Sequence, residues 1–541
     1  MKKNNIIILY NILLCSILFV SCSKDDNSVG VVTTVTVKDF LATIKDNLQT
    51  GEELGKIEAT TNQGELVYSI KTQNPEDAIA IDSKTGKLTV KDGSKFDYEV
   101  NPKLTATAVV KNGEIIKEAS IEITISNIII FSDANFKKAL LSYDPKIDTN
   151  DDNEISIEEA KVVESLDIIS KDISNVSGIE YFTSLVELDC SENQLSNLDV
   201  SNSAALEVLH CDYNQLSSLD VSNNTALERL YCWVNQLSSL DVSNNTALRH
   251  LSCSGNRLSS LDVSNNTALV ALYCSGNRLS SIDVSKNITL KRLNCSYNPL
   301  SSIDVSNNTA LVELSCYRNQ LSSLDVSNNT ALVELSCYRN QLSSLDVANN
   351  TALVVLDCWA NQLSSLDVSN NTALEELWCH SNQLSSIDVS KNTALKRLHF
   401  YNNQLSSLDV SNNTALEKLW CHTNQLSSLD VSNNTALEYL HCHRNQLSSL
   451  DVSNNTALVL LDCWANELSS LDVSNNTALV TLYCGANQLS SLNVKNGNNA
   501  NMKVSTQNNS LLNCIQVDDP AATYLSEWGK DDSVTYKTIC N

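Results

Sequence analysis

Apolar and polar residues recur with a fixed period of 21 residues over more than half of the chain, from Leu185 to Asn499. Fifteen units follow one another without an insertion, and residues 227–247 form a typical one. Apolar residues occupy unit positions 1, 4, 6, 11, 14 and 16, and asparagine occupies position 9. Self-similarity in a constant register predicts a solenoid, in which each unit buries its apolar face against its neighbours.

Unit positions 3 to 6 predict a short parallel strand in every repeat. Fifteen such strands at ~4.8 Å spacing make a sheet roughly 70 Å long. Alternation directs positions 4 and 6 into the core, and positions 3, 5, 7 and 8 toward the concave, solvent-facing side. No helix of useful length fits between positions 11 and 21, so we expect the convex side to be extended as well.

The repeat skeleton in residues 185–499 resembles the leucine-rich repeat, with cysteine in place of a leucine at position 6. The resemblance implies a parallel β solenoid in which the asparagine of position 9 satisfies backbone groups in the turn. Residues 128–184 and 500–541 lie outside the period, and we expect them to cap the two ends, because a terminal repeat would otherwise expose its core.

Residues 34–127 alternate apolar and polar positions in short bursts between Gly and Asn turns, which predicts a β-sandwich. The succession of residues 80–88, 96–99 and 104–108 resembles a cadherin repeat. The resemblance implies a calcium role for Asp97 and Glu99. Thr61 and Gln63 stand where cadherins carry two aspartates, and their loss removes charge that a calcium ion needs.

Residues 148–159, in the middle of the N-terminal cap, match the calcium-binding loop of the EF-hand. Asn153 stands where glycine is usual, and asparagine tolerates the positive φ of that position. The alternative is an acidic, solvated turn. The motif predicts one bound calcium ion with the ligands Asp148, Asn150, Asp152, the carbonyl of Glu154, Ser156 and Glu159.

Residues 1–21 combine two lysines with an apolar run from Ile6 to Val20, which predicts a secretory signal peptide too short to span a bilayer. The run ends in Ser21 and Cys22, which resembles a bacterial lipobox and implies that Cys22 is acylated. Residues 22–33 then form the acylated cysteine and a polar linker. Residues 23–26 resemble the export signal of Bacteroidota surface lipoproteins. We expect an outer-membrane lipoprotein exposed at the cell surface; the alternatives are retention on the periplasmic face and an ordinary signal peptide.

The chain carries 63 acidic and 37 basic residues, a formal charge of -26, which argues against nucleic acid as a partner. Fourteen cysteines occupy position 6, where Phe400 replaces the thiol in one repeat, so we interpret them as buried, free, small hydrophobes. Alternation sends these thiols inward and neighbouring imidazoles outward, which leaves no nucleophile–base pair. We therefore expect no enzymatic activity, and we expect Cys514 and Cys540 to form a disulfide that closes the C-terminal cap.

The aspartates of position 15 repeat from Asp199 to Asp472. Identical acids one strand spacing apart repel one another. They must either accept hydrogen bonds from local backbone amides or bind cations, and we favour the backbone role because Asp beside Ser and Asn is ordinary turn chemistry.

Large aromatic and basic residues gather at the concave positions of the later repeats. Exposed Trp, Tyr and Arg side chains are typical of interface hot spots; the alternative is that the rings stack on one another and stabilise the sheet. Zinc on His422, His441 and His443 is conceivable, but we find no carboxylate or thiolate to complete the set. The predicted ligand-binding residues are Tyr317, Arg318, Tyr338, Arg339, Trp359, Trp378, His380, His399, Tyr401, Trp420, His422, His441, His443 and Trp464.

These features together favour a surface adhesin or receptor-like protein that recognises a protein partner, on another cell or in the matrix, through its concave face. The lipid anchor would make the membrane a second partner. Two alternatives stay open. One is a glycan-binding lipoprotein whose aromatic residues stack on sugars, and the other is a structural cell-cohesion protein.

Overall fold

The structure is a computed structural model that describes residues 32–46, 48–98 and 100–540. The chain divides into two compact units, residues 1–127 and 128–541. The predicted signal peptide, the predicted lipidation site Cys22 and the cadherin-type Glu99 lie outside the described residues. Among the helices that are described, none has the length and hydropathy to cross a membrane.

The N-terminal unit is built from two-, four- and three-stranded sheets around one apolar core, which includes Ile57, Leu88, Phe96 and Ile123. Its longest pairing is the antiparallel hairpin of β8 and β9, and β2 adds to β9 in parallel. The elements are β1 (Val35–Val37), β2 (Phe40–Lys45), β3 (Glu53–Lys56), β4 (Ala59–Thr61), β5 (Val67–Asn74), β6 (Ile79–Ile81), β7 (Lys87–Val90), the 3-10 helix Gly93–Lys95, β8 (Lys103–Asn112) and β9 (Ile115–Ser126).

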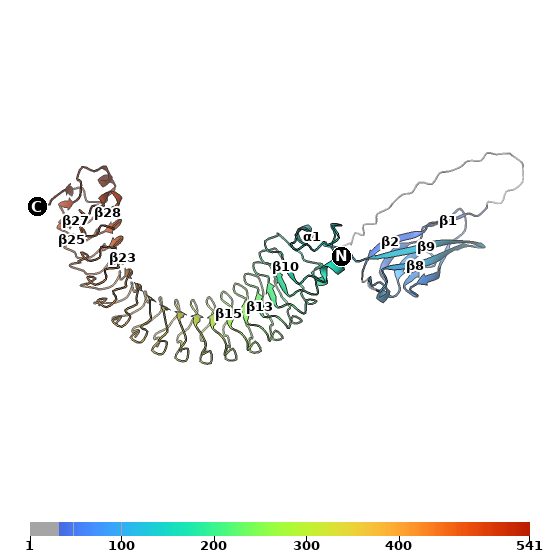
Figure 1. The fold of residues 1–541 in the computed structure, drawn as a ribbon, viewed down its shortest axis with the longest axis horizontal. Coiled ribbons are helices and arrows are strands. Elements are labelled where there is room, and N and C mark those ends of the chain that lie inside the picture. Colours follow the sequence, from blue (N-terminus) through green and yellow to red (C-terminus); the bar gives the residue numbers. More distant parts are fainter. Residues whose placement is uncertain (1–31, 47, 99, 541) are drawn as a thin grey trace. The chain divides into compact units, whose positions relative to one another are not determined.

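The second unit contains a 17-stranded sheet in which every pairing is parallel and joins a strand to the next turn of the chain. In Figure 1 its turns follow an arc, and these strands lie along the inner side. The predicted leucine-rich-repeat solenoid is confirmed. The strands are β10 (Ser165–Asp167), β11 (Glu187–Asp189), β12 (Val208–His210), β13 (Arg229–Tyr231), β14 (His250–Ser252), β15 (Ala271–Tyr273), β16 (Arg292–Asn294), β17 (Glu313–Ser315), β18 (Glu334–Ser336), β19 (Val355–Asp357), β20 (Glu376–Trp378), β21 (Arg397–His399), β22 (Lys418–Trp420), β23 (Tyr439–His441), β24 (Leu460–Asp462), β26 (Thr481–Tyr483) and β28 (Lys503–Ser505).

The strands occupy unit positions 3 to 5, and the leucine at position 4 points into a continuous core. The fourteen repeat cysteines are buried and free, and Phe400 is equally buried in their column. Positions 11 to 21 run through turns and bends without a helix across the array. The core is therefore a set of parallel apolar columns, and each repeat extends every column by one side chain.

Two rows of asparagines satisfy the backbone between repeats. At position 9, Nδ2 of Asn235 donates to the carbonyls of Cys211 and Cys232, and its Oδ1 accepts the N–H of Leu216 at 2.9 Å. This confirms the role implied by the resemblance. At position 19, Nδ2 of Asn245 donates to the carbonyls of Val221 and Asn224. In most repeats this second row takes the place of strand pairing on the convex side. In the last two repeats Ser470–Asp472 pairs in parallel with Ser491–Asn493.

The aspartates of position 15 accept hydrogen bonds from the backbone two residues later, as in the 2.9 Å bond from Ser243 N–H to Oδ1 of Asp241. Hydrogen bonds donated by Ser243 lower the pKa of Asp241, and the same arrangement recurs along the row. The backbone role that we favoured for these acids is confirmed, so the convex charge belongs to the turn structure.

The N-terminal cap comprises α1 (Ala134–Leu141), α2 (Ile157–Ala160), β10 and the 3-10 helix Ile179–Tyr181. Asp133 is the N-cap residue of α1, and its side chain accepts the backbone N–H groups of Asn135 and Phe136. Phe136 and Leu140 on this helix are fully buried and continue the solenoid core. The first strand therefore does not expose its apolar side.

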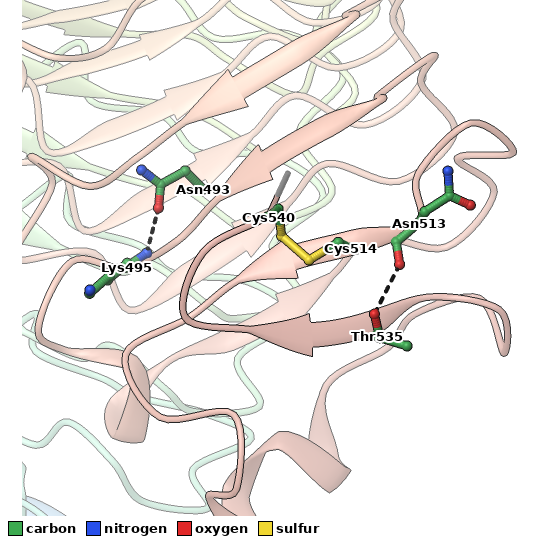
Figure 2. Close-up of a disulfide and its surroundings, with 6 residues drawn as sticks. All are labelled: Asn493, Lys495, Asn513, Cys514, Thr535 and Cys540. Carbon is green, nitrogen blue, oxygen red and sulfur yellow. Dashed lines mark hydrogen bonds between the residues drawn. A yellow bond between two sulfur atoms is a disulfide. The ribbon is translucent and has the colours of Figure 1, made fainter.

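The C-terminal cap closes the other end with a second parallel sheet, and Cys514 is bonded to Cys540 within it (Figure 2). Trp528 covers the last core layer, and its Nε1 donates to the carbonyl of Met502 at 3.0 Å. This sheet begins in the last two repeats with β25 (Ser470–Asp472) and β27 (Ser491–Asn493) and continues in the cap with β29 (Cys514–Gln516) and β30 (Thr535–Lys537). The 3-10 helices Asn499–Asn501 and Thr523–Glu527 complete this end.

Candidate binding surface on the strand side of the solenoid

Seven rings at unit position 7 form one continuous stack, which we call the seven-ring stack. Neighbouring centroids lie 4.1–4.9 Å apart, and neighbouring planes differ by 9–18°. The repeat spacing of about 4.8 Å holds the rings at stacking distance. The members are Tyr317, Tyr338, Trp359, His380, Tyr401, His422 and His443.

A second, shorter row lies beside the stack at unit position 5. Trp378 contacts His399 at 4.3 Å, and His399 stacks on Trp420 at 4.1 Å. Trp420 then meets His441 edge-on at 5.3 Å. The two rows touch where Tyr401 lies 6.3 Å from Trp420, so the predicted rings form a single aromatic surface.

Stacking buries some of the rings that sequence alternation placed on the solvent-facing side. His380 and His399 are on the strand side, but only 5% and 3% of their surfaces are exposed. Burial lowers the pKa of both imidazoles to about 4, with a further contribution from neighbouring cationic groups. These two histidines are therefore neutral spacers within the surface, and a ligand would meet mainly the edges of the rings around them.

The arginines of this surface stand at unit position 8 and lie over aromatic rings. The guanidinium of Arg318 is 4.7 Å from the Tyr297 ring, and that of Arg339 is 4.8 Å from Trp359. Arg444 covers Trp464 at 5.3 Å, and Trp464 is 37% exposed. All three arginines have a left-handed backbone, with φ of 53° to 54°.

The last histidines of the stack lie beside a carboxylate. Oδ2 of Asp462 is 2.9 Å from Nδ1 of His443 and 3.6 Å from Nδ1 of His441. Asp462 ends β24 and pairs in register with His441. Our sequence reasoning missed this acid and wrongly held that no carboxylate completes the set. Adding one 21-residue period to His441 would have found it.

The loop of residues 148–159 folds with its polar groups converging. The N–H of Asp152 donates to both Asp148 and Asn150, and Asp148 is buried. The carboxylate of Glu159 accepts the N–H and hydroxyl groups of Thr149 and of Ser156. Asn153 has a φ of 63°, the conformation for which we expected asparagine to substitute for glycine. The loop carries oxygen-bearing side chains of the kind that calcium prefers, but Asp148, Asp152 and Glu159 do not form a cluster with ligand atoms all within 4.8 Å of one another.

The buried thiols of the repeat column are chemically inert. Burial raises the pKa of Cys253 and of Cys421 to about 12, so they remain protonated near neutral pH. A thiol in this state is neither a nucleophile nor a ready metal ligand.

The period, the parallel sheet and the asparagine rows define a leucine-rich-repeat protein, and the chain belongs to this family. It is 37% identical to the functional domain of InlJ from Listeria monocytogenes, which includes a cysteine ladder; the match covers 60% of this chain and 72% of that one, with a TM-score of 0.58. The internalin InlF from the same organism matches at 25% identity over 61% and 94% of the chains, with a TM-score of 0.51.

A third solved structure shows the same fold at lower identity. The leucine-rich-repeat protein LIC12759 of Leptospira interrogans is 22% identical over 62% of this chain and 92% of its own, with a TM-score of 0.57. No protein-family model and no curated protein sequence matches the chain.

Proposed function

We propose that this protein is a surface-anchored adhesin or receptor-like protein that binds a protein partner through the strand side of its solenoid. The binding surface is centred on the repeats between Tyr317 and Trp464. The observation that carries the proposal is the seven-ring stack together with the arginines beside it, of which Arg339 lies over the Trp359 ring. Aromatic and arginine side chains gathered on one surface are typical of interface hot spots.

Ring orientation favours a protein partner over a glycan. A sugar stacks on the face of an aromatic ring, but within the seven-ring stack each inner ring has a neighbour on both faces. The edges that remain carry the positive part of the ring quadrupole. Together with Arg318 and Arg339 they suit carbonyl and carboxylate groups, which are abundant on protein surfaces.

Variants of the exposed end of this surface test the proposal. Trp464→Ala removes an exposed anchor, and Asp367→Asn changes the convex side. Each immobilised variant is exposed to extracts of candidate host or neighbouring cells. Each variant in solution is also applied to a glycan array. We expect a protein to bind, and Trp464→Ala to lose about 2 kcal/mol or more of binding free energy while Asp367→Asn loses a few tenths. Glycan binding alone, or loss of binding only in Asp367→Asn, would contradict the proposal.

The loop of residues 148–159 is proposed to bind one calcium ion that stiffens the entry to the solenoid. Support comes from the side chains of Asp148 and Asn150, which both accept the backbone N–H of Asp152, and from the buried Glu159. Calorimetry of wild type and Asp148→Ala checks this. We expect a saturable calcium isotherm in wild type that Asp148→Ala abolishes, and unchanged heats in the two proteins would refute it.

Anchoring is proposed to occur through acylation of Cys22, on the basis of the lipobox-like residues before it. Labelling growing cells with a fatty-acid analogue should mark wild type but not Cys22→Ser. Protease added to intact cells should remove the protein if it faces outward. Protection from protease in wild type would place it on the periplasmic side instead.

A further inference from the structure

Two histidines and one aspartate meet at the end of the seven-ring stack. His441 ends β23, His443 follows two residues later, and Asp462 ends the neighbouring strand β24. Two-residue alternation places both imidazoles on the same face. The parallel register pairs His441 directly with Asp462. The fold itself therefore brings the three side chains together.

The spacing of their polar atoms suits a small transition-metal ion. One ligand atom from each residue can be chosen so that all lie within 4.8 Å of one another. In a tetrahedral site with metal bonds of about 2.0–2.1 Å, neighbouring ligand atoms lie about 3.4 Å apart. The distances from Oδ2 of Asp462, 2.9 Å to His443 and 3.6 Å to His441, fall on either side of that value. A bound ion would draw the three ligand atoms, which lie within 4.8 Å of one another, to that spacing.

The polar atoms of the cluster face one another. Nδ1 of His443 is buried, and Oδ2 of Asp462 lies 2.9 Å from it. The other oxygen of Asp462, Oδ1, accepts the backbone N–H of Trp464 at 3.2 Å. That bond orients Oδ2 toward both imidazoles, as an outer hydrogen bond does for a metal ligand.

The neighbouring ring supports the same geometry without joining it. His422 stacks on His443 at 4.2 Å with planes 9° apart, which holds the His443 ring in place. The side chains of His441, His443 and Asp462 are 24%, 22% and 16% exposed, so an ion can enter from solvent. Two imidazoles and one carboxylate favour zinc or a similar ion, because calcium and magnesium require mainly oxygen ligands.

We propose that His441, His443 and Asp462 bind one zinc-type divalent ion, which keeps a coordination position open toward the strand-side surface. Three protein ligands and one open position are a common zinc arrangement. The site is separate from the calcium-type loop at residues 148–159 and does not depend on the identity of the protein partner.

The test is zinc titration of the folded chain, produced without a polyhistidine tag and stripped of metal. Calorimetry should show one site per chain with a Kd below ~10 μM, and cobalt should give the visible absorption of a tetrahedral complex. Asp462→Asn and His441→Gln should each weaken zinc binding at least about tenfold. His210→Gln is the matched control and should leave zinc affinity unchanged. His210 lies 3.7 Å from Asp212, but among the described residues it belongs to no cluster of three potential metal ligands.

Circular dichroism establishes that each variant is folded, so a lost isotherm reports on the site. The absence of a saturable zinc site in wild type would overturn the proposal. So would equal zinc affinity in wild type, Asp462→Asn and His441→Gln, or displacement of zinc by equimolar calcium. Retention of zinc by Asp148→Ala is expected, because that variant alters the distant calcium-type loop.

Discussion

Replacing Trp359 by alanine should destabilise the solenoid, because this ring lies in the middle of the seven-ring stack. It contacts Tyr338 at 4.7 Å and His380 at 4.9 Å, and the guanidinium of Arg339 lies over it. An aromatic pair contributes about 0.5–1.5 kcal/mol beyond buried area, and an exposed cation–π contact about 0.5–1 kcal/mol. Two pairs and one cation–π contact give a loss of about 1.5–4 kcal/mol, before the lost burial is added.

Trp464→Ala is the matched control, since Trp464 lies beyond the stack and meets Arg444 at 5.3 Å. Its expected loss is about 0.5–1 kcal/mol. Urea unfolding followed by circular dichroism measures both losses. Hydrogen exchange should show faster opening of β18 to β20 in Trp359→Ala, because each repeat is stabilised by its neighbours. Equal unfolding midpoints for the two variants would refute the claim that stacking stabilises the array.

Three further outcomes are expected. The pKa of His380 is about 4 in the folded protein against about 6.5 when unfolded, so the protein loses stability as pH falls from ~6.5 toward ~4. His380→Phe should make that part of the stability–pH curve shallower, while His399 and His422 keep some of the slope. Replacing Cys514 and Cys540 together by serine removes a disulfide between residues 26 positions apart in the sequence. This should lower the stability of the cap by about 3.5 kcal/mol, measured as increased proteolysis of residues 500–541. Val234 is a β-branched residue with a φ of 52°, so Val234→Gly should raise the free energy of unfolding of the protein by about 1 kcal/mol, measured as a higher urea midpoint. An unchanged midpoint would show that the left-handed residue is not strained.

The repeat period predicts most of the fold because parallel pairing adds one period per strand. A residue and its neighbour 21 positions later must lie side by side, so the columns of Leu230 and Cys232 follow directly from their spacing. Alternation likewise predicts which face each side chain occupies. Knowing the face of the sheet on which a side chain lies does not give its χ angles. The near-complete burial of His399 between two tryptophans could therefore not be anticipated.

The site was only partly predictable for a similar reason. Asn245 in the second asparagine row looks like an ordinary turn residue, and its role depends on carbonyls one period earlier. Asp462 was overlooked because the period was applied only toward the N-terminus, from His443 to His422, and not forward from His441 to Asp462. Contacts between consecutive repeats are distant in sequence but fixed in space, and only explicit use of the period reveals them.

The in-register pairing of the sheet makes the length of the protein adjustable in whole steps. Residues 311–331 and 332–352 differ only at Ser327 and Ala348, and their strands β17 and β18 pair residue for residue. Loss or duplication of such a unit would rejoin every apolar column and both asparagine rows without a mismatch. It would also shorten or lengthen the aromatic row by one ring. Recombination between nearly identical coding segments could therefore change the reach of the molecule while leaving its architecture intact.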